Sequence, residues 1–198
     1  LFSGMQSSLS MVYDREMGVM RLLLTAPLPR WYLLTAKLLS GTFLSVIQAY
    51  VFLIICVPIV NLIVNFSTPI IGWLYILPAT ILFGMMLGAL GLLISVYIKQ
   101  LENFAGTMNF VIFPMFFISS ALYPLWRLKD NGAEFVWWIA NINPFTYGVE
   151  LVRWASLGQI YVPGLLVTFL CTILFLTFAT IGYDPQRGMA KKGKGKPS

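Results

Sequence analysis

The chain has 198 residues, of which 59% are apolar and 10% are charged, and its formal net charge is +6. A soluble domain carries about 25% charged residues, so this composition excludes an ordinary soluble enzyme and indicates an integral membrane protein. At roughly 20 residues for each span, the length allows about four spans and leaves no room for a soluble catalytic domain.

Residues 1–13 mix Ser, Gly and Met with apolar residues, and they are too few to cross a bilayer alone. We interpret them as the end of a preceding span or as an interfacial segment. Because the chain begins with Leu1 rather than Met, we also expect further sequence upstream.

Residues 14–37 predict an amphipathic helix and a stiff turn at the inner membrane surface. One helix face carries the small and polar residues Asp14, Gly18, Arg21 and Thr25. Asp14 and Glu16 stand where a helix dipole favours negative charge, and Pro27 predicts the end of the helix. Alternatively, the cations only anchor the segment to anionic lipid. The pair Pro27 and Pro29 favours a rigid docking element.

Four apolar runs follow, each long enough to cross a bilayer and free of charged side chains. They extend over about Leu38 to Val60, Gly72 to Ile98, Phe104 to Tyr123 and Pro163 to Tyr183. Apolar runs in buried soluble helices seldom exceed about 14 residues. The predicted fold class is therefore all-α, a polytopic transmembrane helix bundle over residues 38–183.

Within the bundle, residues 124–162 predict a re-entrant element on the outer side. The run from Phe135 to Ile142 is apolar but too short to span, so we expect it to dip into the outer leaflet and return. Interfacial anchors are predicted at Trp126, Trp137 and Trp138. An ordinary structured loop is the alternative.

A second helix is predicted after this dip. Asn143 suits its N-cap and Pro144 its first helical position. Glu150 and Arg153 have the spacing of an ion pair on one helix face.

The distribution of Lys and Arg predicts the orientation of the chain. With residues 14–37 in the cytoplasm, alternating spans also place Lys99 and the basic tail, residues 184–198, inside. The outer cations Arg127, Lys129 and Arg153 are matched there by Asp130, Glu134 and Glu150. Both ends of the chain are thus expected in the cytoplasm.

Few residues inside the predicted spans are chemically reactive. The chain has no His and only Cys56 and Cys171, and no carboxylate lies inside a span, so metal sites, Cys nucleophiles and proton relays lack parts. The tail sequence from Gly188 to Gly195 resembles a phosphate-binding loop but lacks its Ser or Thr, and it is better interpreted as a basic tail touching lipid. We therefore expect no cofactor on this chain, and ATP with Mg on a partner.

The polar, small and aromatic residues of the spans are interpreted as packing elements. Interhelical hydrogen bonds are the simplest role of Gln48, Asn61, Asn65, Asn109, Ser119 and Ser120. Close helix approach is predicted at Gly84, Gly88 and Gly91. The phenylalanines of the third span either line an apolar cavity or face lipid: Phe110, Phe113, Phe116 and Phe117.

The chain contains two motifs. The first motif comprises Arg15, Glu16, Gly18, Arg21, Leu23, Leu24, Ala26, Pro27, Leu28 and Arg30, with Lys37 following. The second runs from Asn143 through Pro144, Phe145, Thr146, Tyr147, Gly148, Val149 and Glu150 to Arg153. Together they resemble the permease subunits of type-2 ATP-binding-cassette (ABC) exporters, a family that includes exporters of drugs, of lipo-oligosaccharide nodulation signals and of bacterial surface polysaccharides. The resemblance covers the chain from the end of the family's second span, and it implies six spans in a full permease.

By this resemblance, the first motif is a cytoplasmic coupling helix that docks on a separate ABC ATPase subunit. The implied ATPase-coupling residues are Arg15, Glu16, Gly18, Arg21, Pro27 and Arg30. The implied outer gate segment contains Asn143, Pro144, Phe145, Tyr147, Glu150 and Arg153. A second permease subunit, identical or different, is implied as a further partner, in the bacterial cytoplasmic (inner) membrane.

Three functions are compatible with the sequence. An exporter permease driven by a partner ATPase predicts both motifs. A passive channel or secondary carrier predicts charged or broken helices at the membrane midplane, and a membrane-embedded lipid-modifying enzyme predicts clustered His, Asp or Glu. The scarcity of ionisable groups in the spans favours the first function.

Overall fold

The computed structural model describes residues 8–14, 17, 30–64, 69–98, 101–125, 127 and 134–183. A short helix covers residues 8–14. The longer helices are α3 (Arg30–Val64), α4 (Ile70–Tyr97), α5 (Leu101–Phe117), α7 (Glu134–Ile142), α8 (Pro144–Ser156) and α9 (Val162–Gly182). The described residues contain no strand, which confirms the predicted all-α class.

Three of the described helices are long and apolar enough to cross a bilayer. Their apolar stretches are Trp31–Val60, Ile71–Tyr97 and Val162–Gly182, with 30, 27 and 21 residues. At 1.5 Å per residue the shortest stretch is about 31 Å long, which matches the hydrocarbon thickness of a bilayer. They lie in α3, α4 and α9 and confirm a polytopic helical membrane protein.

The helix that carries the first span begins before the predicted apolar run. α3 starts at Arg30, so Trp31 to Lys37 form its first turns. Lys37 has an acidic partner, Asp14, beside the helix. The predicted membrane entry near Leu38 stays a prediction, because a helix can extend beyond the span that it carries.

The third predicted span is shorter than expected. Its helix, α5, ends at Phe117, and its apolar stretch falls short of the length that crosses a bilayer. The Ser119 hydroxyl donates to the Phe116 carbonyl at 2.6 Å and accepts from the Ala121 amide at 3.2 Å. These local bonds compete with helix continuation. The interhelical role predicted for the Ser119 side chain is therefore wrong.

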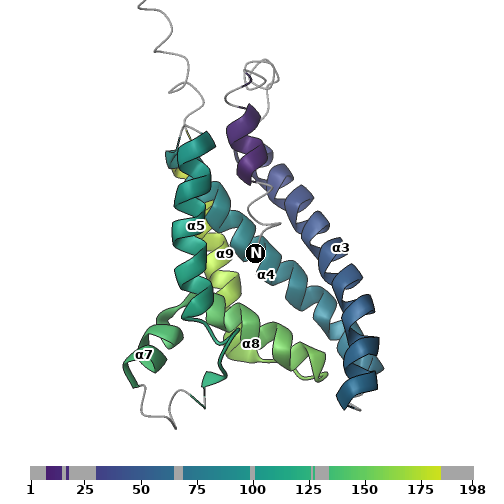
Figure 1. The fold of residues 1–198 in the computed structure, drawn as a ribbon. Coiled ribbons are helices and arrows are strands. Elements are labelled where there is room, and N and C mark those ends of the chain that lie inside the picture. The colour runs from purple at the N-terminus through teal and green to yellow at the C-terminus, as the bar shows by residue number, and fades with distance from the viewer. Residues whose placement is uncertain are drawn as a thin grey trace, which may run out of the picture.

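The central helix of the bundle is α4. It packs against α3, α5, α8 and α9, and in Figure 1 it crosses between α3 and α5. Its buried side chains enter three separate core clusters, through Ile76 and Ala79, through Met86 and Leu87, and through Ala89 and Leu92. A helix that is apolar on all faces suits this enclosed position.

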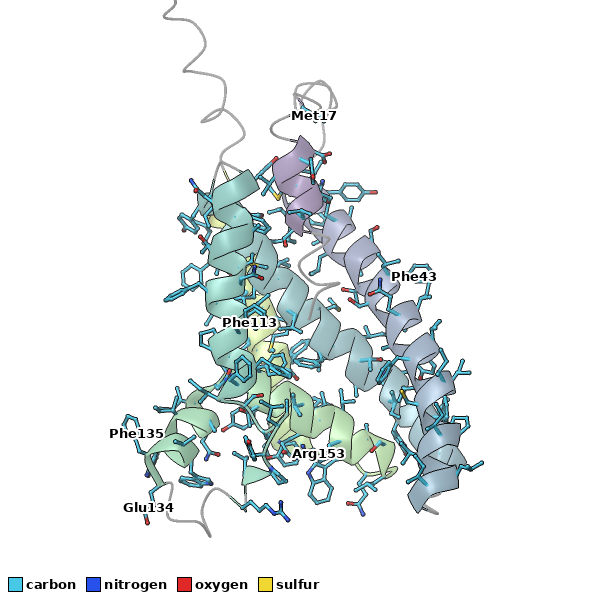
Figure 2. All side chains as sticks on the ribbon, viewed as in Figure 1. Met17, Phe43, Phe113, Glu134, Phe135 and Arg153 are labelled. Carbon is cyan, nitrogen blue, oxygen red and sulfur yellow. The ribbon has the colours of Figure 1, made fainter. Side chains whose placement is uncertain are left out.

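The outward face of α3 carries large apolar side chains that the described residues leave uncovered. Phe43, Phe52 and Leu62 keep most of their surface exposed, and Figure 2 shows Phe43 pointing away from the bundle. Exposed Gln48 and Asn109 likewise lie on outer helix faces, whereas Asn65 and the Asn61 side chain lie outside the described part. Surface of this kind is suited to lipid or to another apolar protein surface.

The short helix of residues 8–14 lies at one end of the bundle, and α7 and α8 lie at the other (Figure 1). The 8–14 helix precedes the first sequence motif, and α8 contains most of the second. The helix bundle therefore separates the described flanks of the predicted coupling segment from the described part of the predicted outer segment.

Candidate coupling and outer gate sites

Most of the predicted ATPase-coupling residues lie outside the described part of the chain. They are Arg15, Glu16, Gly18, Arg21 and Pro27. For Arg30 the structure gives the backbone only, as the first residue of α3. Their role in coupling stays a prediction.

The start of the predicted coupling helix differs from expectation. Asp14 is the last described residue of the 8–14 helix, and the Met17 amide continues the helical pattern by donating to the Tyr13 carbonyl at 2.9 Å. The prediction that Asp14 interacts with a helix N-terminus is therefore wrong. Its carboxylate forms an ion pair with Lys37 instead, across 23 positions of sequence.

At the opposite end, α8 begins as its sequence predicts. Asn143 has extended backbone angles, and its side-chain oxygen accepts a hydrogen bond from the Phe145 amide at 3.0 Å. Pro144 follows at the first helical position, where a missing N–H costs nothing. The predicted N-cap is confirmed, and it fixes the point where α7 turns into α8.

Two side chains of the outer segment bind carbonyls at the end of α5. The Asn143 amide nitrogen donates to the Met115 carbonyl at 2.7 Å, and the Arg153 guanidinium donates to the Ser120 carbonyl at 2.8 Å. Carbonyls near a helix C-terminus lack intrahelical partners, so the first bond satisfies a carbonyl that α5 leaves open, and the second binds the turn just beyond the end of α5 at Phe117. We call this pair of bonds the α5–α8 latch.

The predicted ion pair within α8 is also present. Arg153 Nη1 lies 2.5 Å from Glu150 Oε1, with the Glu150 side chain 12% exposed and that of Arg153 39% exposed. One guanidinium thus serves Glu150 and the Ser120 carbonyl at once, which suits the planar arrangement of its donors. The Glu150 carboxylate in turn holds Arg153 in place for the latch.

Tight packing holds α8 against α4 and α9. Phe145 is buried. The centroid of its ring lies 5.1 Å from that of the Phe83 ring on α4 and 6.2 Å from that of the Phe116 ring on α5. A Cβ atom at Gly148 would overlap the Phe83 ring, and one at Gly164 of α9 would lie 2.9 Å from the Tyr147 carbonyl. Phe116 therefore faces the core, whereas Phe110, Phe113 and Phe117 stay exposed on α5.

Tyr161 closes the same region just before α9. Its ring stacks on Trp154 with centroids 6.1 Å apart. Burial raises the pKa of the Tyr161 hydroxyl, and the neighbouring Tyr147 and Glu150 raise it further. The phenol therefore stays protonated at neutral pH.

The short helix α7 exposes its apolar side chains. Phe135 and Ile142 are each 77% exposed, and Trp138 is 62% exposed beside Trp137. Figure 2 shows Phe135 at the outer edge of this helix. The predicted anchor Trp126 lies outside the described residues.

Sequence reasoning missed two features of these sites. Asp14 and Lys37 each stood next to an apolar segment, which was a signal that they could pair. The carbonyl acceptors of the latch gave no signal, because every residue has a carbonyl.

In the described part of the chain, the side-chain hydroxyls of Ser120 and Thr146 are buried without a hydrogen-bond partner.

Among the described residues, no group of three His, Cys, Asp or Glu side chains is placed to hold a metal ion. Cys56 and Cys171 are both free thiols.

Comparison with known proteins gives one consistent picture. The family model described as ABC-2 type transporter matches residues 1–157, which include both motifs. A protein named putative transport permease ycf38, from Porphyra purpurea, is 30% identical over 155 residues, or 77% of this chain and 50% of that protein. Nodulation protein J from Rhizobium leguminosarum bv. viciae is 29% identical over 86 residues, or 43% of this chain and 32% of that protein.

The chain therefore spans about half the length of the ycf38 relative and about a third of the length of nodulation protein J. No solved structure matches the chain.

Proposed function

The chain belongs to the ABC-2 type transporter family, and from this premise we propose that it is the membrane-spanning permease subunit of an ATP-driven exporter. The proposed substrate is an amphipathic or lipid-linked molecule, moved outward across a bacterial inner membrane. Membership of this family implies an ABC ATPase subunit as a partner. We propose that ATP and Mg bind on that subunit and that this chain is not an enzyme.

One observation carries the proposal: the 8–14 helix and the start of α3, which flank the first motif in sequence, lie at the opposite end of a bundle of apolar helices from α8, which contains most of the second motif (Figure 1). A permease needs a site on the inner side that receives force from the ATPase and an element on the outer side that opens or closes the transport pathway. The helix bundle connects the two. The apolar walls favour a cargo with a lipid-like part. The family that the two motifs resemble includes exporters of lipo-oligosaccharide nodulation signals, which are a cargo of this kind.

The proposed orientation places residues 14–37 and the basic tail, residues 184–198, in the cytoplasm. The excess of Lys and Arg in these segments supports it. The outer segment then faces the other side, with the exposed apolar side chains of α7 in the outer leaflet. This arrangement supports the re-entrant interpretation of residues 124–162.

In the proposed mechanism, two permease subunits enclose a cavity whose exposure alternates. Closure of the ATPase pair on nucleotide pushes on the coupling segment, and α3, which begins at Arg30, receives the push directly. The α5–α8 latch makes the outer helices move with the bundle as one body. ATP hydrolysis on the cytoplasmic side thereby changes the side of the membrane to which the cavity opens.

Charge reversal in the coupling segment tests the proposal. Glu16→Arg and Arg21→Glu should each abolish transport and substrate-stimulated ATPase activity, because both place the wrong charge against the ATPase groove. The full-length permease is reconstituted in vesicles with its ATPase subunit, and transport, the ATPase rate and the amount of bound ATPase are measured. Lys192→Glu, in the basic tail, is the matched charge-reversing control and should keep all three.

Normal export and ATPase stimulation by both coupling variants would refute the coupling role.

A further inference from the structure

We propose that Asp14 and Lys37 form a strut that joins the two ends of the predicted coupling segment and transmits its movement to the whole helix bundle. The inference rests on the proposed function, because only a permease driven from its inner side has such a movement to transmit. Neither residue belongs to the predicted ATPase-coupling set. The strut therefore adds two positioning residues to it.

The strut joins two helices through side chains that are mostly shielded from solvent. The Lys37 ammonium forms an ion pair with Asp14 Oδ2 and donates a second hydrogen bond to Ser10 Oγ at 3.3 Å. The Lys37 side chain is 16% exposed and the Asp14 side chain is 29% exposed. Salt screens a shielded pair less than an open surface pair, so this contact persists at physiological ionic strength.

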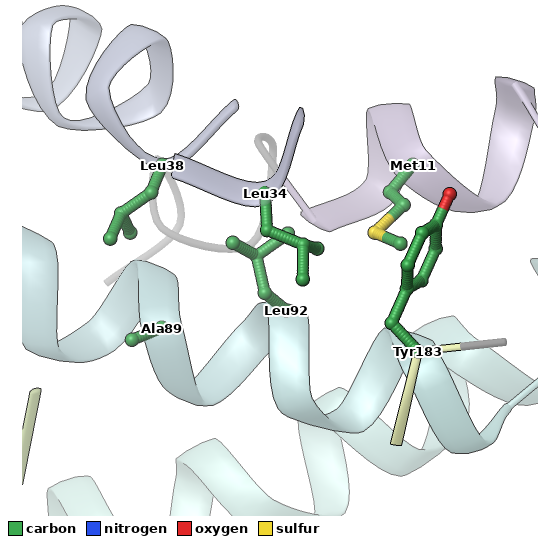
Figure 3. Packing of buried hydrophobic residues seen from close by; sticks show 6 residues of the cluster. All are labelled: Met11, Leu34, Leu38, Ala89, Leu92 and Tyr183. Atoms are coloured by element: carbon green, nitrogen blue, oxygen red, sulfur yellow. The ribbon is translucent and has the colours of Figure 1, made fainter. Parts of the chain in front are cut away.

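The 8–14 helix is fixed on one side by α3 and α4. Met11 is fully buried and packs in a cluster with Leu34 and Leu38 of α3, with α4 and with Tyr183, which follows α9 (Figure 3). The Ser95 hydroxyl of α4 also contacts the Met11 sulfur at 3.5 Å. Movement of this helix therefore displaces the inner ends of α3, α4 and α9.

On its other side the same helix packs against α5. Val12 is fully buried in a second cluster with Phe104, Met108 and Ile112. Ser8 fits against Gly91 of α4, where an added Cβ would lie 2.7 Å from the Ser8 hydroxyl. These contacts hold the 8–14 helix on both sides, so it moves with its neighbours.

Asp14 and Lys37 flank the predicted coupling segment directly. An ion pair between the flanks holds the two helices that carry the segment at a fixed separation. A push on the segment then reaches α3 and the 8–14 helix together, and through Met11 and Val12 it reaches the rest of the bundle. Without the pair, the apolar contacts around Met11 still join the 8–14 helix to α3, but the push is transmitted between the two helices less directly.

A series of charge substitutions separates the effect of the Asp14–Lys37 ion pair from the effect of each charge alone. Asp14→Asn and Lys37→Met each remove one partner. The double variant Asp14→Lys with Lys37→Asp restores an ion pair in reverse, and Lys37→Arg keeps the original one. Lys99→Gln removes another cation predicted on the same membrane side and serves as the matched control.

The readout reports movement at the far end of the bundle and needs no cargo. Spin labels are placed at Leu62→Cys on α3 and Phe135→Cys on α7, which are 88% and 77% exposed, in a full-length permease with Cys56→Ala and Cys171→Ala. The permease is reconstituted in vesicles with its ATPase subunit. The distance between the labels is measured by electron paramagnetic resonance without nucleotide and after nucleotide trapping, and bound ATPase is quantified in parallel.

We expect a nucleotide-dependent distance change in the unmodified permease, in the Lys37→Arg variant and in the control. The two single variants should lose the change although the ATPase subunit stays bound, and the charge-swap variant should recover it. Single variants that keep the full change would overturn the strut, as would a loss that the charge swap does not recover. A permease with native Asp14 and Lys37 that shows no change would contradict the proposed function instead.

Discussion

Asn143 shows how much one side chain can organise in an apolar bundle. Its side-chain oxygen, Oδ1, caps α8 by accepting a hydrogen bond from the Phe145 backbone amide. Its side-chain nitrogen, Nδ2, donates to the Met115 backbone carbonyl. A serine can supply the first bond but has no group that reaches the second. Asn143 therefore combines a local role that sequence reveals with a tertiary role that it does not.

Substitutions at Asn143 should separate these two roles. Asn143→Ser keeps the cap and loses the latch, and we expect it to lower the unfolding free energy by about 1 kcal/mol, the worth of a typical hydrogen bond. Asn143→Ala loses both and should cost about 2 kcal/mol in total. Unfolding of the purified permease in detergent measures the difference, and equal stability of the two variants would contradict a separate latch bond.

At the scale of elements, α8 is the most tightly held part of the outer end. It packs on α4 and α9, binds the end of α5 through the latch, and places Gly148 against the Phe83 ring. The absent side chain at Gly148 is what allows the two helices to approach this closely. Rigid attachment of α8 suits an element that moves with the bundle.

A pair of glycine substitutions tests this packing. Gly148→Ala should destabilise the protein by about 1–3 kcal/mol, because the added methyl group forces the Phe83 ring to move. Gly84→Ala is the matched control, because its Cβ would lie 3.5 Å from the Thr42 methyl, an ordinary contact. It should be neutral or stabilising by up to about 1 kcal/mol.

Thermal unfolding of both variants measures the contrast, and the double variant Gly148→Ala with Phe83→Leu should recover part of the loss. A Gly148→Ala variant as stable as Gly84→Ala would contradict the close approach of α4 and α8.

Elements were more predictable than their ends. Apolar runs predicted α3, α4 and α9, because length and composition decide which helices suit a bilayer. The end of α5 is followed by a serine side chain that bonds nearby backbone groups, and the pair between Lys37 of α3 and Asp14 joins residues far apart in sequence. Composition does not encode single contacts of this kind.

The same limit applied to the sites. The α8 cap and the Glu150–Arg153 pair are local patterns, so sequence predicted both. The latch to Met115 and Ser120 and the Asp14–Lys37 pair join residues brought together only by folding.

At the scale of the whole molecule, the bundle separates two ends with different chemistry. One end carries the Asp14–Lys37 pair and flanks the basic coupling segment, and the other carries the latch and the exposed apolar face of α7 (Figure 1). The helices between them offer hydrocarbon and few reactive groups. The molecule is suited to transmitting motion that another protein generates.

The central claim is that this permease moves cargo only when a separate ATPase drives it. The most direct measurement uses vesicles that contain the full-length permease with or without its ABC ATPase subunit, and follows a fluorescent lipid-linked oligosaccharide as it crosses the membrane. We predict uphill movement only with the ATPase subunit and ATP together. Uphill movement by the permease alone would contradict the account.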